Sequence, residues 1–145
     1  MKMVLCSLLE KLLKEYENHH SPLYFEFKKI KEHYVFTDVN QALLQTINRQ
    51  RADFIGQTLE TAPHLGDKAT RTKLKTIYPL AWSGKKVIFY GFPAANMDIF
   101  MITYLEPQYA KGEVVQVRGR CASFDKNELP DVAQHTKEFV TFEIS

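Results

Sequence analysis

The side chains that could do chemistry in this chain are few and stand far apart. The two cysteines, Cys6 and Cys121, form no C-x-x-C pair, so the sequence indicates neither a structural zinc site nor a disulfide framework. We expect two buried free thiols in a reducing compartment. His19, His20 and His33 are expected on the surface, and no cluster of His, Cys, Asp and Glu has the spacing of a metal site. No metal site is predicted.

Motifs of catalysis are also absent from the sequence. It contains no nucleophile elbow, no P-loop and no glycine-rich phosphate loop. Four aspartates fall at expected helix caps or turns, where aspartate usually has a structural role: Asp38, Asp53, Asp67 and Asp98. We therefore expect a protein that is not an enzyme.

Length and composition predict one ordinary globular domain. The chain has 145 residues, of which 45% are hydrophobic and 25% are charged, and this is enough to bury a core. A net charge of +2 is too small to indicate nucleic-acid binding. No apolar run is long enough to span a membrane, and the apolar start ends at Glu10 without the cleavage site of a signal peptide. We expect a cytoplasmic protein with no nucleic-acid or membrane partner.

The first element that we expect is an amphipathic helix over residues 1–20. Its apolar residues recur at steps of three and four and form one stripe: Leu5, Leu8, Leu9, Leu12, Leu13 and Tyr16. Pro22 disfavours helical geometry at Ser21, so the helix should end before it. The stripe could pack on this chain's own sheet or on a second copy, and the sequence leaves this open.

Two strands and several helices are expected next. The strands cover residues 23–30 and 33–39, and Asn40 is expected to cap a short helix. A longer helix then begins near residue 68. Pro79 inside it predicts a kink or an early end, and Gly84 is expected to terminate it.

The last third of the chain is expected to be β-structure. It holds three strands, over residues 85–92, 97–106 and 113–124. Pro107 cannot donate to a strand ladder and belongs at a strand end or edge, while Gly112 supplies the positive φ of a tight hairpin turn. The tail has some β character at residues 139–144 but no clear partner. The predicted fold class is α+β, with a five-stranded antiparallel sheet, helices on one face and an N-terminal amphipathic helix.

Three stretches in this order resemble a PAS (sensory box) domain. They are VFTDVNQALLQTINRQRADFIGQTL (35–59), LAWSGKKVIFYGF (80–92) and IFMITYLEPQYAKGEVVQVRG (99–119). The resemblance divides the chain into an N-terminal flanking helix (1–20), a PAS-like domain (23–125) and a C-terminal tail (126–145). It implies a bacterial sensory module that dimerises through the flanking helix. The residues of that dimer interface are Leu5, Leu9, Leu12, Leu13 and Tyr16.

The resemblance also implies a ligand cavity between the longest helix and the sheet. Its expected lining is Leu74, Ile77, Tyr78, Trp82, Phe89, Phe100, Ile102 and Val117. Tyr78 could orient a small molecule with its hydroxyl, and Trp82 with its indole N–H. The alternative interpretation is that these side chains pack against one another as a solid core.

No particular cofactor is predicted. The flavin branch of the family needs a cysteine in an Asn-Cys-Arg phrase, and no cysteine lies between Cys6 and Cys121. His64 stands where the coumaryl branch has its thioester cysteine, and imidazole cannot form that bond. A haem ligand is expected on the long helix, whereas His64 belongs to the loop before it, which favours an exposed loop residue.

Two functions remain open from the sequence. The first is a sensor of a small ligand in signal transduction, acting on a kinase, a diguanylate cyclase or another effector. The second is a protein–protein interaction module with a filled core and no ligand. The family often closes with Asp-Ile-Thr before its effector, whereas residues 123–125 read Ser-Phe-Asp. We therefore expect either a stand-alone sensor or a piece of a longer signalling protein. A third class, a small cone-shaped isomerase or binding fold, needs an acid inside the cavity, and none is expected there.

Overall fold

The chain folds around one antiparallel sheet. A computed structural model describes residues 2–65, 68–91, 99–125 and 140–144. Its helices and strands, in chain order, are α1 (Lys2–His19), β1 (Leu23–Ile30), β2 (His33–Val39), α2 (Gln41–Ile47), η1 (Arg51–Asp53), η2 (Pro63–Leu65), α3 (Lys68–Trp82), β3 (Lys86–Gly91), β4 (Ile99–Ala110), β5 (Glu113–Asp125) and β6 (Val140–Ile144). The strand order is β2-β1-β5-β4-β3-β6, with antiparallel pairing throughout.

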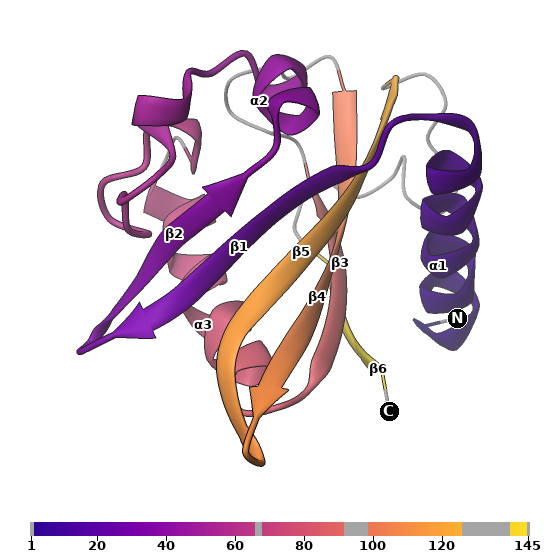
Figure 1. The fold of residues 1–145 in the computed structure, drawn as a ribbon. Coiled ribbons are helices and arrows are strands. Elements are labelled where there is room, and N and C mark those ends of the chain that lie inside the picture. Colours follow the sequence, from indigo (N-terminus) through magenta and orange to yellow (C-terminus); the bar gives the residue numbers. More distant parts are fainter. Residues whose placement is uncertain (1, 66–67, 92–98, 126–139, 145) are drawn as a thin grey trace.

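The five-stranded antiparallel sheet predicted from the sequence is confirmed as β1 to β5. One prediction about the tail was wrong, because β6 has a partner: it pairs with the edge strand β3, and Ile88 lies opposite Phe142. Figure 1 shows the resulting layers, with α2 and α3 on one side of the sheet and α1 on the other. We call the side under α2 and α3 the inner face and the side under α1 the outer face.

The inner face carries the larger of the two buried clusters. Alternate residues of each strand point to this face. We call this cluster the inner core. Its buried strand residues are Leu23, Phe25, Phe27, Phe36, Val39, Val87, Phe89, Leu105, Val117 and Cys121. Helices α2 and α3 contribute Leu43, Leu44, Ile47, Leu74, Ile77, Tyr78 and Ala81.

Local chemistry fixes the ends of these elements as the sequence predicts. The side chain of Asn40 accepts from the backbone N–H of Leu43 at 3.1 Å, which caps α2, and from that of Tyr24 at 3.2 Å, which ties the cap to β1. The β4–β5 hairpin turns at Lys111 and Gly112, both at positive φ (53° and 81°).

Two prolines behave differently in the structure. Pro107 lies within β4, beyond the last residue paired to β3, so at this point β4 pairs with β5 alone, which agrees with the expected edge position. Pro79 does not end α3 early as expected, because the helix continues to Trp82. Gly84, at a φ of 106°, then closes it, with the Lys85 N–H bonded to Leu80 O.

Candidate functional site

Six of the eight residues predicted to line a ligand cavity meet at the inner core. Leu74, Ile77 and Tyr78 on α3 are buried against Phe89 and Val117 on the sheet, and the half-buried Trp82 packs on the same cluster. The structure therefore brings together the predicted lining residues of α3, β3 and β5.

Phe100 and Ile102 are the two exceptions. Both are fully buried on the outer face, beneath α1, and this part of the prediction was wrong. Met101 and Leu105, at odd-numbered positions of the same strand, contact the inner core instead. Side chains alternate between the two faces of a strand, so choosing the wrong parity for β4 moves every residue to the opposite layer.

Aromatic rings in direct contact occupy the inner core. Phe27 on β1 stacks on Tyr78 on α3, with ring centroids 4.0 Å apart and planes at 1°. Tyr34 meets both rings edge-on, at 5.7 and 6.0 Å. Phe36 packs on Phe54 with centroids at 4.6 Å. These contacts join α3, β1, β2 and the loop after η1 into one packed group.

The polar atoms in this core stay uncharged at neutral pH. Burial raises the pKa of the Tyr78 hydroxyl well above its usual value, and the nearby Cys121 adds to the effect. Burial also raises the pKa of the Cys121 thiol to about 12, although the Thr103 hydroxyl, 3.6 Å away, opposes the shift. The inner core can therefore offer apolar contact and neutral hydrogen bonds, but neither a thiolate nor a phenolate.

Helix α1 packs on the outer face through a separate cluster, which we call the outer seam. Leu9 and Leu13 are fully buried there, and the other buried residues of the seam are Ile88, Tyr90, Phe100, Ile102 and Ala122. The stripe thus packs on this chain's own sheet. The prediction that Leu9 and Leu13 face a second copy differs from the structure, because the chain covers both itself. Leu12 and Tyr16 are half-buried, and the side chain of Leu5 lies outside the described part.

One arginine joins the last turn of α1 to the sheet. Arg120 on β5 donates from Nε and Nη2 to the two carboxylate oxygens of Glu17, at 3.0 and 2.9 Å. Its Nη1 donates to Oε1 of Glu106 on β4 at 2.7 Å, and its guanidinium lies over the Tyr104 ring, 5.1 Å from the centroid. We call Glu17, Arg120 and Glu106 the clamp. Its bidentate geometry fixes the orientation of the helix on the sheet.

Opposing effects act on the pKa of the clamp arginine. Partial burial lowers the pKa of Arg120, but the hydrogen bonds that Arg120 donates to Glu17 and Glu106, together with the charges of these carboxylates, outweigh burial, so the net shift is upward. The guanidinium therefore stays charged, and the clamp carries two negative charges against one positive charge.

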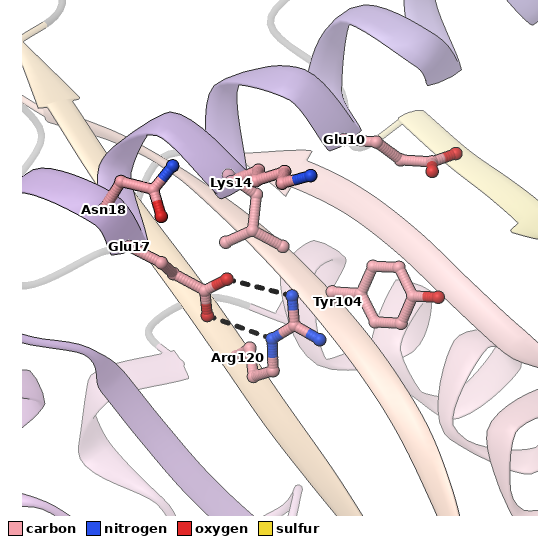
Figure 2. Close-up of a pocket in the computed structure, with 7 residues that line it drawn as sticks. Glu10, Lys14, Glu17, Asn18, Tyr104 and Arg120 are labelled. Carbon is pink, nitrogen blue, oxygen red and sulfur yellow. Dashed lines mark hydrogen bonds and ion pairs between the residues drawn. The ribbon is translucent and has the colours of Figure 1, made fainter.

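Beside the clamp lies a pocket of about 450 Å³, which we call the α1 pocket. Figure 2 shows Glu10, Lys14, Glu17 and Asn18 in its wall from α1, and Leu13 also lines this wall. Tyr104 and Arg120 form the wall from the sheet. The volume is in the range of small-molecule sites.

Comparison with known proteins identifies the fold. No protein-family model matches the sequence, and the search of curated proteins gave no significant match. Among solved structures, the chain is similar to a light–oxygen–voltage domain studied with a flavin analogue (10% identity, 81% of this chain and 87% of that chain covered, TM-score 0.57). It is also similar to a sensory box sensor histidine kinase from Vibrio cholerae (14% identity, 86% and 98% covered, TM-score 0.53). The chain has the PAS, or sensory box, fold.

A third similar structure is VqmA of Vibrio cholerae in a complex with a ligand and DNA (18% identity, 79% of this chain covered, TM-score 0.53). The chain spans half of that protein. Proteins that share the PAS fold thus include a DNA-bound receptor, and the expectation that this chain has no nucleic-acid partner gains no support from the comparison.

Several features of the described residues bear on the cofactor predictions. Among the residues that the structure describes, no three His, Cys, Asp or Glu side chains lie close enough to hold a metal ion. His64 belongs to η2, but its side chain lies outside the described part, so its expected exposure stays a prediction.

Within the described ranges no helix has the length and apolar character needed to cross a membrane. Of the aspartates expected at caps or turns, Asp67 and Asp98 also fall outside those ranges.

Sequence reasoning missed the clamp and the α1 pocket. Tyr104 and Arg120 are register partners on β4 and β5, but their pairing follows only from the strand alignment. Glu17 comes 103 residues before Arg120. One available signal was Arg120 itself, a charged residue directly before the apolar Cys121 and Ala122, which are both buried.

Proposed function

We propose that the chain is a sensory or regulatory module of signal transduction, in which the state of the inner core controls how α1 sits on the sheet. A single observation carries the proposal: the inner core and the outer seam share the same strands. On β4, Leu105 packs in the inner core while Ile102 packs under α1, and on β5, Cys121 and Ala122 divide in the same way. The PAS fold supports it, since a similar structure is that of a sensory box sensor histidine kinase.

The coupling has a direct physical route. A packed core responds to an added group by shifting side chains and backbone, because its interior has few voids. A ligand or partner that displaces an inner ring would move β4 and β5, and α1 is fixed to both through the outer seam and the clamp. Such a ligand acts only if it binds the two positions of α1 with different affinity.

The free energy that keeps α1 docked on the sheet is small enough for the binding of a ligand to offset it. Burial of Leu9 and Leu13 stabilises the docked helix by about 3–6 kcal/mol. The ion pairs of the clamp, with Arg120 35% exposed, add about 1 kcal/mol because water screens them. A ligand that binds one state more tightly by a comparable amount would shift α1 from mostly docked to mostly free.

The finer parts of the proposal concern the ligand and the partner. The ligand is small and apolar and takes the place of side chains around Tyr78. A freed α1 exposes Leu9 and Leu13, which then pair with a second copy and give the homodimer expected from the sequence. The output is passed to an effector such as a kinase or a diguanylate cyclase, in a cytoplasmic and non-catalytic role.

The second candidate function, a protein–protein interaction module with a filled core, has its own support. The parallel stack of Phe27 on Tyr78, closed by Tyr34, brings three rings of the inner core into direct contact. In this case α1 stays docked whatever happens in the inner core, and the outer face acts only as a fixed surface.

The deciding experiment overfills the inner core and follows α1. Val117→Leu adds a methylene at a fully buried inner site on β5, whereas Val115→Leu adds the same group at a site that is 43% exposed on the same strand. Hydrogen exchange with mass spectrometry is measured on the whole chain, and native mass spectrometry is used to look for a co-purifying molecule. We expect α1 amides to exchange roughly tenfold faster in Val117→Leu than in Val115→Leu, with β2 unchanged, because overfilling costs about 1–3 kcal/mol and acts first on β5 and its neighbours.

Two results separate the candidates. If sedimentation finds more dimer in Val117→Leu than in Val115→Leu, the freed helix pairs as proposed. If exchange rises evenly over the whole sheet, or α1 keeps its protection, the two faces are not coupled and the interaction module is the better description.

A further inference from the structure

The α1 pocket is surrounded by more negative than positive charge. Its acidic groups are Glu10 and Glu17, and Glu106, which does not line the pocket, accepts a hydrogen bond from Arg120. Its basic groups are Lys14 and Arg120. The Arg120 charge is already bonded to two carboxylates, so the balance of the five groups is one negative charge. A cation is therefore favoured over an anion in this pocket.

Glu10 is the carboxylate most accessible to a ligand. It is exposed, and its partner in the structure is the thiol of Cys6, a weak donor 3.6 Å from Oε1. Figure 2 shows Glu10 at one end of the pocket, with no interaction drawn between it and Lys14. Within the described part of the chain, no Lys or Arg forms an ion pair with Glu10.

The hydroxyl of Tyr104, in the sheet wall of the α1 pocket, responds to the nearby carboxylates through its pKa. Its pKa is raised by burial first and then by the charges of Glu106 and Glu10, which outweigh the opposing effect of Arg120. Carboxylates from α1 and from β4 thus both act on this hydroxyl. A positive group placed between Glu10 and Tyr104 would be attracted from both walls.

The rest of the pocket suits a short apolar body. Leu13 is 1% exposed and lines the pocket from α1, and the half-buried ring of Tyr104 lines it from the sheet. One face of the ring is already covered by the Arg120 guanidinium, which leaves the hydroxyl edge and Glu10 as the groups that a ligand cation would meet. An aliphatic chain of a few carbons would lie along Leu13.

We propose that the α1 pocket binds a small organic cation, an aliphatic amine whose ammonium group bridges Glu10 of α1 and Tyr104 of β4. The bound amine joins the helix to the sheet in addition to the clamp, and it holds α1 in the docked position. Only this last step rests on the proposed function, since binding itself needs no movement of α1. The site lies on the outer face, separate from the inner core where the PAS resemblance places a ligand.

The test is an NMR titration of the whole ¹⁵N-labelled chain with three probes of the same length. Pentylamine carries the cation, pentanoate an anion and pentanol no charge. We expect pentylamine alone to shift the backbone amides of Leu13, Tyr104 and Arg120 in a saturable way, and to bind less tightly as salt is added. Preference for pentanoate, equal binding of all three probes, or absence of saturable shifts with pentylamine would overturn the proposal.

Matched variants on α1 locate the charge that matters. Glu10→Gln keeps the size of the side chain and should weaken pentylamine binding about fivefold, the value of one exposed ion pair. Glu15→Gln makes the same change at an exposed site that does not line the pocket and should leave binding unchanged. Lys14→Gln removes the repelling charge and should strengthen binding. Equal effects of Glu10→Gln and Glu15→Gln would reject the site.

The outcomes are independent of the test of function. The exchange experiment on Val117→Leu needs no amine, and the pentylamine titration needs no coupling between the faces of the sheet. A failed titration with intact coupling therefore rejects the amine site alone. Binding of pentylamine without any gain in α1 protection against hydrogen exchange rejects the claim that the amine holds the helix.

Discussion

Phe27 and Tyr78 lie 51 positions apart and stack face to face, with ring centroids 4.0 Å apart and planes at 1°. The pair joins β1 to α3 at the middle of the inner core, where both side chains are buried. Tyr34 closes the pair edge-on at 87° to each ring. Because one ring comes from the helix and two from the sheet, this group determines the distance of α3 from the sheet.

Removal of the Tyr78 ring should therefore loosen α3 on the sheet. We expect Tyr78→Leu to lower the free energy of unfolding by about 2–4 kcal/mol, since it removes buried area and a ring pair. Tyr78→Phe keeps the ring and should cost less than half as much. Urea unfolding of both variants measures the difference. Equal losses in the two variants would assign the stability to the hydroxyl rather than to the stack.

Gly119 on β5 leaves the space that Phe25 uses. The two residues are register partners on β5 and β1, and a Cβ added at Gly119 would overlap the Phe25 ring. That ring packs edge-on against Phe36 and Phe54 at 5.9 and 6.1 Å, so it has little freedom to move away. We expect Gly119→Ala to cost about 1–3 kcal/mol of unfolding free energy, as overfilled cores do.

A double variant tests that cause. Phe25→Leu vacates the space that the new methyl group needs, so adding Gly119→Ala to it should cost much less than Gly119→Ala alone. Denaturant unfolding of the two single variants and the double variant gives the coupling energy. If the two losses simply add, backbone effects at Gly119 explain its cost and steric overlap does not.

The sequence predicts the elements of this fold better than their faces. Chemistry within a few residues determined the Asn40 cap, the Lys111–Gly112 turn and the end of α3 at Gly84, and all three are present in the structure. The partner of β6 was not predictable, because an edge strand pairs through backbone groups that every residue has. The early end that Pro79 could have caused is not seen, since α3 continues to Trp82 and helix context overrides the average effect of a proline, whereas the alternative of a kink at Pro79 stays a prediction.

The same limit applies to the site. A strand pattern with period two shows that Phe100 and Ile102 share a face, but it does not say whether α3 or α1 covers that face. For α1, the stripe of leucines predicted burial correctly and left the partner open. The clamp needed three elements in register, and no local pattern links Glu17 to Arg120.

The two thiols should differ sharply in reactivity. Cys121 is 1% exposed, and burial raises its pKa to about 12, so almost none of the reactive thiolate exists near neutral pH. Cys6 is half-buried on α1. We expect iodoacetamide to alkylate the native protein once, at Cys6, and to alkylate both thiols in urea. Peptide mass spectrometry locates the label, and rapid native labelling of Cys121 would mean that the inner core opens far more often than its packing implies.

Tyr24 and Asp38 provide a test of pH dependence outside the two clusters. The Tyr24 hydroxyl donates to Oδ2 of Asp38 at 2.7 Å and to Oε2 of Glu26 at 3.1 Å, on the outer face of β1 and β2. The hydrogen bond from Tyr24 lowers the pKa of Asp38 most. Desolvation opposes it, while the Val39 N–H and Arg51 add to the lowering.

The sign of the pH effect follows from that lowered pKa. A carboxyl whose pKa is lower in the folded state stabilises the fold fully above its unfolded value, about 4, and loses this contribution as pH falls through the folded value. Tyr24→Phe removes the largest cause, so it should lower the free energy of unfolding by about 1 kcal/mol at neutral pH. Below the folded pKa of Asp38 the wild type has lost the same contribution, and the gap between the two proteins should shrink. Urea unfolding at neutral and at acidic pH measures the gap, and carboxyl NMR titration should show the pKa of Asp38 rising in the variant. A gap that stays constant over the acid range would mean that the Tyr24 hydroxyl stabilises β1 and β2 without acting through the charge of Asp38.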